Sequence, residues 1–404
     1  MSLPQRPLDA DARRFCRRFL FGVVVLAILV AAFDAFVDPY LVFGSPLIAH
    51  VNRIKPASQD RQALAKAYLF RRMRPQTVIF GSSKAQVGID PKSPLLPPDA
   101  GLVFNFGWAG IWTNDLFAIV KEAADNAPIH RILVVVDLID FMQPLRPSAD
   151  GSTGPSYLPD WRRRQIERAE ALLSFDALKD SIQTVLGQNE RYPSGFIADG
   201  RMLEGDFQRS VDAGGAAVMF DQKRAFMLYK IALTNERLAS VSDRKKVDAT
   251  AISQIVALGR KRHIQIDIAI SPVHAEELRA IVLGGLWPRY EAAKRALTDV
   301  VAADGGGQVA LWDFMGFDPI STEPVPPSDN RVDRTKWFWE PNHFRPALGE
   351  KMLATIYHGG AEFGRRLTPD MIDDDLAQEA TSQRDDEAGH APEYALLRAA
   401  MNSR

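Results

Sequence analysis

The chain has 404 residues, and 49 Lys and Arg balance 50 Asp and Glu to give a formal net charge of −1. Apolar residues make up 46% and charged residues 25%, which are the proportions of an ordinary globular protein and exclude a globally disordered chain and a polytopic membrane protein. The balanced charge excludes a generally basic protein that binds nucleic acid. The single cysteine, Cys16, excludes an intramolecular disulfide, a CxxC redox site and a zinc site built from several thiolates.

An apolar run near the N-terminus predicts a membrane anchor. Phe19–Val37 has 19 residues, interrupted only by Asp34, and at 1.5 Å per residue it is long enough to span about 30 Å of hydrocarbon. Arginines precede the run and no matching cluster follows it, which predicts that residues 1–18 lie in the cytoplasm. A cleaved signal peptide is the alternative. Either interpretation places the main domain across the inner membrane, in the periplasm of a bacterial source.

Five short runs rich in apolar and β-branched residues predict strands at Thr77–Phe80, Leu102–Phe106, Ile132–Val136, Ile264–Ile270 and Val309–Trp312. Helical patterns occur at Ser58–Met73, Asn114–Ala127, Glu276–Ala303 and Arg345–His358. Strands that are apolar throughout and alternate with helices are typical of a parallel sheet covered on both faces. We therefore expect an α/β domain over residues 38–367, with a five-stranded, doubly wound, flavodoxin-like sheet.

The longest interval between predicted strands, about residues 150–260, has little strand character. Asp160–Leu186 and Lys223–Leu258 have helical patterns, so we interpret the interval as an α-helical insertion beside the sheet. Acidic residues gather after the last predicted helix, at Asp373–Asp375 and again at Asp385–Glu387. Residues 368–404 are therefore expected to form a solvated, partly disordered tail.

The turn after the first predicted strand is a candidate catalytic motif. Gly81, Ser82, Ser83 and Lys84 follow the apolar run directly, at the carboxyl edge of the sheet, where open α/β folds bind their ligands. A serine at this point stands at the start of a helix, beside backbone N–H groups that can stabilise an oxyanion. A plain structural turn remains the alternative when the motif is considered alone.

A second candidate motif, Trp339–Phe344, lies in a predicted loop before the last helix. Glu340 precedes His343 by three positions, so one loop can supply an imidazole that deprotonates a serine hydroxyl and a carboxylate that orients the imidazole. The alternative is a histidine that only caps the helix. Because both motifs fall at one edge of the predicted sheet, Ser83, His343 and Glu340 are the candidate catalytic triad. The seven histidines lack the spacing of metal ligands, so no metal site is predicted.

With these motifs the sequence resembles the SGNH (GDSL-like) hydrolase superfamily. It looks more like the membrane-anchored branch related to periplasmic alginate O-acetylation proteins and the D-alanine transfer protein of teichoic acids. The resemblance covers most of residues 38–365 and is weakest in the helical insertion. Gly81 and Ser83 match the glycine and the nucleophile of the first motif, and Ser82 stands in place of its usual aspartate. Glu340 replaces the aspartate of the Asp-x-x-His pair. The resemblance implies serine chemistry without a cofactor.

The resemblance also implies an oxyanion hole. Asn105 and Gly107, after the second predicted strand, match the block whose glycine N–H enters that hole. The superfamily's asparagine normally follows the third strand, where this chain has Asp137, and an ionised carboxylate cannot donate a hydrogen bond. Either Asp137 is not in that role, or Asn105 or Asn114 supplies the donor, or the hole has only two backbone donors. Asp137 is then a candidate substrate-binding residue or a structural cap.

Lys84 and His274 are two further candidate binding residues. Lys84 follows the nucleophile and would attract an anionic sugar, or would pair with a surface acid. His274 follows the fourth predicted strand at the same edge of the sheet, so it would line the pocket, or would pack within its loop.

The resemblance implies O-acetyl transfer or acetyl-ester hydrolysis on a cell-surface polysaccharide through an acyl-serine intermediate. The implied partners are this polysaccharide or an acyl donor, the inner membrane and a membrane-bound O-acyltransferase. The rival hypothesis is a catalytically inactive SGNH-like domain that binds polysaccharide or scaffolds an exopolysaccharide modification system. A serine α/β-hydrolase fits less well, because its acid lies far upstream of its histidine. A sulfotransferase would have more small polar residues after Lys84.

Overall fold

The computed structural model describes residues 10–143, 157–239, 246–303, 307–360 and 362–402. The chain divides into two compact units: unit 1 comprises Met1–Tyr68 and Pro159–Gly195, and unit 2 comprises Leu69–Leu158 and Phe196–Arg404. The sequence predicted a single helical insertion at about 150–260. Its residues 150–156 and 240–245 lie outside the described part of the chain. The structure assigns the first helices of this interval to unit 1 and the later ones to unit 2.

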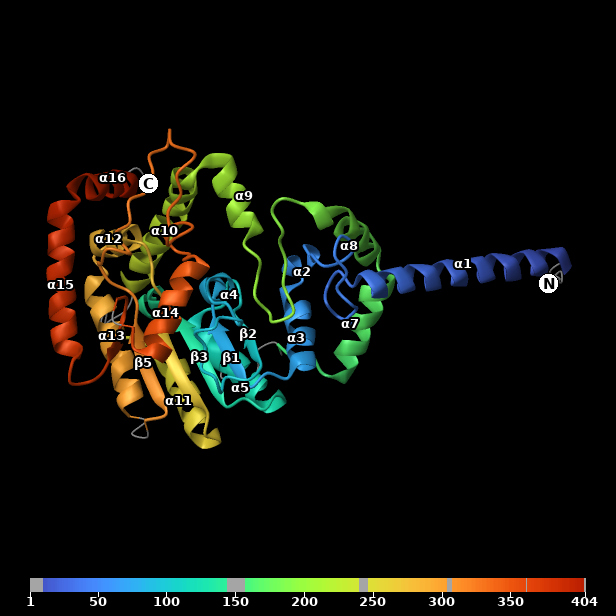
Figure 1. Ribbon diagram of the computed structural model, residues 1–404, viewed down its shortest axis with the longest axis horizontal. Coiled ribbons are helices and arrows are strands. Elements are labelled where there is room, and N and C mark those ends of the chain that lie inside the picture. Colours follow the sequence, from blue (N-terminus) through green and yellow to red (C-terminus); the bar gives the residue numbers. More distant parts are fainter. Residues whose placement is uncertain (1–9, 144–156, 240–245, 304–306, 361, 403–404) are drawn as a thin grey trace, which may run out of the picture. The chain divides into compact units, whose positions relative to one another are not determined.

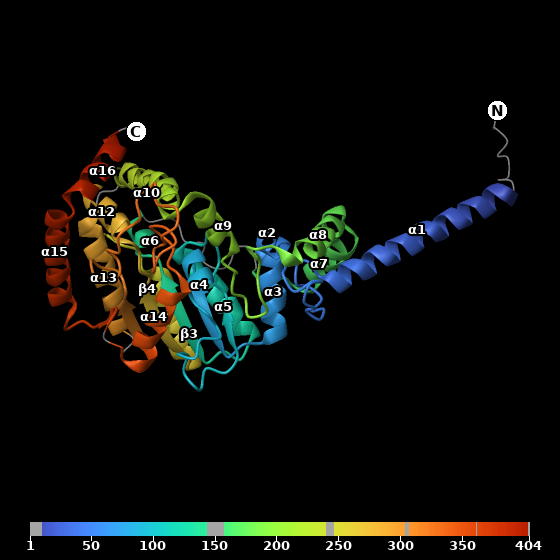
Figure 2. The ribbon, with the colours of Figure 1, turned by 45° about the horizontal axis from the view of Figure 1, so that its top comes forward.

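Unit 1 is helical, with α1 (Ala10–Val37), α2 (Ala57–Asp60), α7 (Trp161–Leu173), α8 (Phe175–Leu186) and the short η2 (Gly187–Asn189) (Figures 1 and 2). By length and composition, α1 could cross a membrane over Asp11–Val37, which contains the predicted anchor. Its side chains are exposed from Arg13 to Leu29. Residues 1–9 of the predicted cytoplasmic segment lie outside the described residues.

Unit 2 contains a mostly parallel sheet of six strands, in the order β2-β1-β3-β4-β5-β6. The strands are β1 (Thr77–Gly81), β2 (Val103–Asn105), β3 (Arg131–Val136), β4 (Gln265–Ile270), β5 (Val309–Asp313) and β6 (Arg365–Leu367). The first five lie where the sequence predicts strands, and all their pairings are parallel. The sixth, β6, was not predicted and pairs antiparallel with β5. Its residues Arg365, Arg366 and Leu367 carry little of the apolar pattern that reveals a buried strand.

Helices cover both faces of this sheet (Figure 1). The helices of the core are α3 (Gln62–Met73, begun in unit 1), α4 (Ser83–Gly88), η1 (Thr113–Asp115), α5 (Leu116–Asn126), α6 (Leu138–Met142), α11 (Thr250–Arg262), α12 (Ala275–Leu283), α13 (Trp287–Ala302) and α14 (Pro346–His358). One face packs against α4 and α14, whose Ala85, Leu348 and Met352 share a core with strand residues such as Ile79 and Leu133. Helices α5 and α11 contact β1 and β4 and pack against each other.

Four other helices complete unit 2: α9 (Gly205–Gly214), α10 (Ala216–Ala239), α15 (Ile372–Gly389) and α16 (Ala391–Asn402). The last two correct the prediction of a solvated tail. The guanidinium of Arg279 donates two hydrogen bonds of 2.8 Å to Asp386 of α15, and both side chains are buried. Glu379 of α15 accepts a 2.6 Å hydrogen bond from the buried Lys294. Acidic residues of the C-terminal segment therefore hold it against the domain.

Candidate active site

Ser83 is the first residue of α4, directly after β1. Gly81 allows the tight turn between them: a Cβ atom at this position would lie 2.6 Å from the carbonyl oxygen of Val135 on β3. Ser82 caps the helix, and its hydroxyl accepts a 3.3 Å hydrogen bond from the backbone N–H of Lys84. The turn thus leaves the half-buried Ser83 side chain at the carboxyl edge of the sheet.

Ser83, His343 and Glu340 form a continuous hydrogen-bonded chain. The Oγ atom of Ser83 lies 2.8 Å from Nε2 of His343, and Nδ1 of His343 contacts Oε1 of Glu340. The other carboxylate oxygen of Glu340 accepts a 2.9 Å hydrogen bond from the backbone N–H of Asn342. Base, orienting acid and nucleophile therefore have the connectivity of a serine triad.

Packing holds the loop that carries the base and the acid. Phe338 and Phe344 form an isolated antiparallel bridge around it, and the N–H of Trp339 donates a 2.8 Å hydrogen bond to the carbonyl of His343.

Burial raises the pKa of the Glu340 carboxyl, but the adjacent His343 and Lys223 and the Asn342 N–H lower it more, so this pKa lies below its ordinary value. Glu340 is therefore an anion that orients His343.

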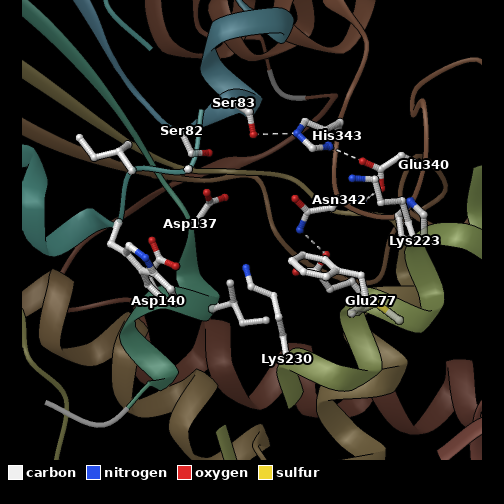
Figure 3. Close-up of a pocket in the computed structure, with 17 residues that line it drawn as sticks. Ser82, Ser83, Asp137, Asp140, Lys223, Lys230, Glu277, Glu340, Asn342 and His343 are labelled. Atoms are coloured by element: carbon white, nitrogen blue, oxygen red, sulfur yellow. Dashed lines mark hydrogen bonds and ion pairs between the residues drawn. The ribbon is translucent and has the colours of Figure 1, made fainter. Parts of the chain in front are cut away.

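The triad opens into a pocket of about 340 Å³ (Figure 3). Its other lining residues come from the loop before η1, from α6, from α10, from α12 and from the His343 loop, and include Trp112, Asp137, Asp140, Lys223, Phe226, Lys230, Glu277 and Asn342. Figure 3 shows Lys230 extending from α10 toward the space between Asp137 and Asn342. The pocket thus places both carboxylates and ammonium groups around the candidate nucleophile.

Asp137 and Lys84 form an ion pair beneath the nucleophile. Their Oδ1 and Nζ atoms lie 2.6 Å apart, and Lys84 is buried. Burial raises the pKa of Asp137, but Lys84 and hydrogen bonds from Lys84 and Ser82 lower it more, so the pKa lies below its ordinary value. Burial lowers the pKa of Lys84, whereas Asp137 and Glu277 raise it more. Lys84 therefore pairs with an acid, but with a buried one in place of the surface acid that the sequence suggested.

Asp140, one turn further along α6, is a second carboxyl group at the pocket. Its Oδ2 atom accepts hydrogen bonds of 2.9 Å and 3.1 Å from the backbone N–H and the hydroxyl of Thr113. Burial, together with the negative charge of Asp137, raises the pKa of Asp140 to about 7. Two carboxyl groups with opposite pKa shifts thus line one wall, Asp137 ionised and Asp140 titrating near neutrality.

The structure corrects the predicted oxyanion hole at Gly107 and Asn105. The N–H of Gly107 donates a 2.8 Å hydrogen bond to Oδ1 of Asn105, so it is already engaged. The amide of Asn105 is buried and donates to the carbonyls of Ala85 and Ile89 at 2.8 Å and 2.9 Å. Neither residue lines the pocket. This pair instead fixes the loop after β2 to α4, a structural role.

His274 is also placed away from the pocket. It caps α12, where its Nδ1 atom accepts a 3.2 Å hydrogen bond from the Glu276 N–H, and its Nε2 atom lies 2.9 Å from the Glu323 carbonyl oxygen. Burial lowers its pKa to about 4. His274 is therefore a neutral, packed histidine, in agreement with the second of its two predicted roles.

Sequence reasoning missed the two lysines that α10 contributes. Lys223 and Lys230 are seven residues apart, two helical turns, which places both on one face of α10. Lys230 lies over the rings of Trp112 and Phe226, at 5.5 Å and 5.4 Å from their centroids. Among the described residues, no carboxylate lies within ion-pair distance of either ammonium group. The seven-residue spacing was visible in the sequence, but nothing there linked α10 to Ser83.

No family model matches the sequence, and no curated protein is significantly similar to it. Among the described residues, no three His, Cys, Asp or Glu side chains are grouped as ligands for a metal ion. The site is a hydrogen-bonded chain of Ser83, His343 and Glu340 beside a pocket.

Proposed function

We propose that the protein is a membrane-anchored, SGNH-like serine acyl-transfer enzyme. It would act as an O-acetyltransferase or acetylesterase on a cell-surface polysaccharide, with α1 in the inner membrane, the N-terminus inside and unit 2 in the periplasm. The observation that carries the proposal is the hydrogen-bonded chain from Ser83 through His343 to Glu340. The order of the first five strands, β2-β1-β3-β4-β5, is that of flavodoxin-like sheets and supports the SGNH-like assignment.

The geometry supports a double displacement. His343 takes the proton from the Ser83 hydroxyl through Nε2, and Oγ attacks the acyl carbonyl carbon to form a tetrahedral oxyanion. The intermediate collapses as the protonated His343 returns the proton to the leaving alkoxide, which leaves an acyl-serine. His343 then deprotonates the acceptor, a sugar hydroxyl or water, whose oxygen attacks the acyl carbon and releases Ser83. Glu340 keeps Nδ1 protonated throughout.

The pocket carries both carboxylates and ammonium groups, and its ammonium groups would bind an anionic part of a substrate. The N–H of Ser83 remains a candidate oxyanion donor, while Gly107 is engaged elsewhere. Lys223 and Lys230 line the pocket, and their charges would stabilise an oxyanion or a substrate carboxylate or phosphate. Asp137, paired with Lys84, would accept hydrogen bonds from sugar hydroxyls.

A second candidate is a catalytically inactive domain that binds polysaccharide or scaffolds a membrane-bound O-acyltransferase. Two observations favour it: the engaged N–H of Gly107, and the carboxylate of Asp137 at the position where a donor is expected.

Hydrolysis of a chromogenic acetyl ester by the full chain in detergent separates the two candidates. Under the enzymatic proposal Ser83→Ala loses the activity, whereas the matched Ser82→Ala variant, which loses a helix cap and a hydrogen bond to Asp137, keeps most of it. Equal release by all three proteins would favour the inactive domain. Loss only in Ser82→Ala would move the nucleophile by one residue.

A further inference from the structure

The exposed surface of unit 1 carries an unusual concentration of large apolar side chains outside α1. On α7 and α8 they are Trp161, Ile166, Leu173, Phe175, Ile182 and Leu186. Phe175 and Leu186 are 81% and 77% exposed, which is extreme for residues of their size in a folded helix. Single exposed apolar residues need no explanation, but a contiguous set marks an interaction surface.

Helix α8 buries small or polar side chains and exposes large apolar ones, the reverse of a surface helix in a soluble domain. Its buried residues are Ala177, Ser181 and Thr184, which are small or polar. Its exposed Phe175, Ile182 and Leu186 follow one another at intervals of seven and four residues, so they form one stripe. The exposed Lys179 lies on the same face, and its long side chain can reach the lipid headgroups. A helix that faces water normally exposes its polar side. The stripe on α8 therefore fits an apolar environment rather than water.

The position of α8 beside α1 in unit 1 indicates that the apolar environment of its stripe is the lipid bilayer. Helices α7 and α8 both pack against α1, and they lie beside its carboxyl-terminal end (Figures 1 and 2). Residues 13–29 of α1 are exposed, whereas Asp34 and Val37 near its end are buried. Tyr40, just after α1, donates a 2.6 Å hydrogen bond to Asp180 of α8. The two helices thus meet α1 only over its last turns.

The length of α1 then sets the depth of these helices. The 19 residues of the run Phe19–Val37 cover about 28 Å at 1.5 Å per residue, so nearly all of them are needed to cross the hydrocarbon core. The last turns of the run therefore lie at the far interface of the bilayer. Helices that pack against those turns lie at the same depth, beside lipid headgroups and the first acyl carbons.

The net charge of α7 and α8 indicates that this surface binds the apolar part of the lipid rather than charged headgroups. The segment 160–186 has five basic residues, Arg162, Arg163, Arg164, Arg168 and Lys179, and five acidic residues, Asp160, Glu167, Glu170, Asp176 and Asp180. Its net charge is zero, so anionic lipids would gain little by contacting it. Insertion of the apolar stripe is the main source of membrane affinity that this surface offers.

We propose that α7 and α8 form an interfacial hairpin whose residues Phe175, Ile182 and Leu186 insert into the bilayer that α1 spans, at the interface where α1 ends. This inference rests on the proposed membrane anchoring by α1. The protein would then hold the membrane at two points, a spanning helix and a hairpin lying in the interface.

Depth-dependent quenching on the full chain tests the hairpin. With the natural Cys16 replaced by serine, the variants Phe175→Cys, Ile182→Cys and Leu186→Cys each carry an environment-sensitive fluorophore in phosphatidylcholine nanodiscs. Gln183→Cys, exposed but off the stripe of α8, is the matched control, and Leu26→Cys reports on the insertion of α1. Quenchers are lipids labelled near the headgroup, lipids labelled deep in the chain, and aqueous iodide.

The proposal expects blue-shifted emission at all three stripe positions, with several-fold stronger quenching by the shallow lipid label than at Gln183. It expects iodide to quench these positions several-fold less than Gln183, and anionic lipid or added salt to change neither result. Stripe labels that the lipid quenches no more than Gln183, while Leu26 is quenched by the deep label, would overturn the hairpin alone. Labels shielded from iodide without lipid quenching would show a protein contact and overturn it too. If the deep lipid label did not quench the fluorophore at position 26, the proposed insertion of α1 into the membrane would itself be overturned.

Discussion

The hydroxyl oxygen of Ser83 lies 2.8 Å from Nε2 of His343, although 260 positions of the chain separate the two residues. The parallel sheet explains this distance, because the loop after β1 and the loop that follows β5 both reach its carboxyl edge. Glu340 completes the arrangement from the same loop as His343. The relationship gives each of the three side chains a separable role.

His343→Ala should cost more activity than Glu340→Gln. The first change removes the base, whereas the second removes only its orienting charge and keeps an oxygen able to accept from the Asn342 N–H. By analogy with other serine triads, the expected losses in kcat are about 10⁶-fold for the base and about 10⁴-fold for the acid. Initial rates with an acetyl ester measure both. A Glu340→Gln variant as inactive as His343→Ala would contradict the separation of roles.

Lys84→Met should destabilise the fold, because it leaves the ionised Asp137 without its buried partner. Removal of one partner of such a pair costs about 3–5 kcal/mol. Urea unfolding measures the change in the free energy of unfolding. The double variant Lys84→Met/Asp137→Leu should recover most of the loss, since no unpaired charge remains. Additive losses in the double variant would show that the two side chains do not stabilise each other.

Lys230→Gln should reduce kcat/KM for an anionic acyl ester more than for a neutral one. The ammonium lines the pocket and has no carboxylate within ion-pair distance among the described residues. Loss of one favourable charge contact of this kind amounts to roughly tenfold in kcat/KM. The exposed Lys246→Gln is the matched control and should change neither substrate. Equal losses for succinyl and acetyl esters would argue against charge recognition by Lys230.

The raised pKa of Asp140 should make the protein less stable as the pH rises. The carboxyl loses its proton near its ordinary pKa of 3.8 when unfolded, and near a pKa of about 7 when folded. The stability that this proton contributes is complete below the unfolded pKa and is lost as the pH rises through about 7, at up to about 1.4 kcal/mol per pH unit. Asp140→Asn should flatten the slope between about pH 4 and about pH 7 in urea unfolding.

Glu379, whose pKa burial also raises to about 7, contributes a second slope of the same sign. Asp140→Asn should therefore reduce the slope without abolishing it, and Glu379→Gln should reduce it independently. An unchanged slope in Asp140→Asn would mean that this carboxyl is already ionised well below neutral pH in the folded protein.

The parallel strands, and the placement of Ser83, His343 and Glu340 at one edge of the sheet, could be predicted from the sequence because their signals are local. A strand such as Arg131–Val136 is buried on both faces, and its apolar run shows this directly. The pair Glu340 and His343 occupies one short loop, so its spacing alone indicates a shared role. Ser83 follows a strand by two residues, and that placement is also local.

The other features depend on contacts between distant segments. The acidic C-terminal segment has the composition of a solvated tail. Its Asp386 nevertheless accepts a hydrogen bond from Arg279, which lies 107 positions away, and the sequence does not reveal this contact. Asn105 and Gly107 do lie at the end of the second strand, as the sequence predicts. Only the structure shows that the Gly107 N–H bonds to Asn105 and that the Asn105 amide bonds to α4. Lys230 reaches the pocket from a helix whose sequence carries no mark of the site.

Detection of an acyl group on Ser83 would test directly whether this serine is the nucleophile. The full chain and its Ser83→Ala variant are each incubated with a chromogenic acetyl ester, quenched in acid, and examined by intact mass and peptide mapping. A single acetyl adduct is expected on the peptide that contains Ser83, and none on the variant. An unmodified wild-type protein that releases no product, or an adduct that persists in Ser83→Ala, would contradict this role of Ser83.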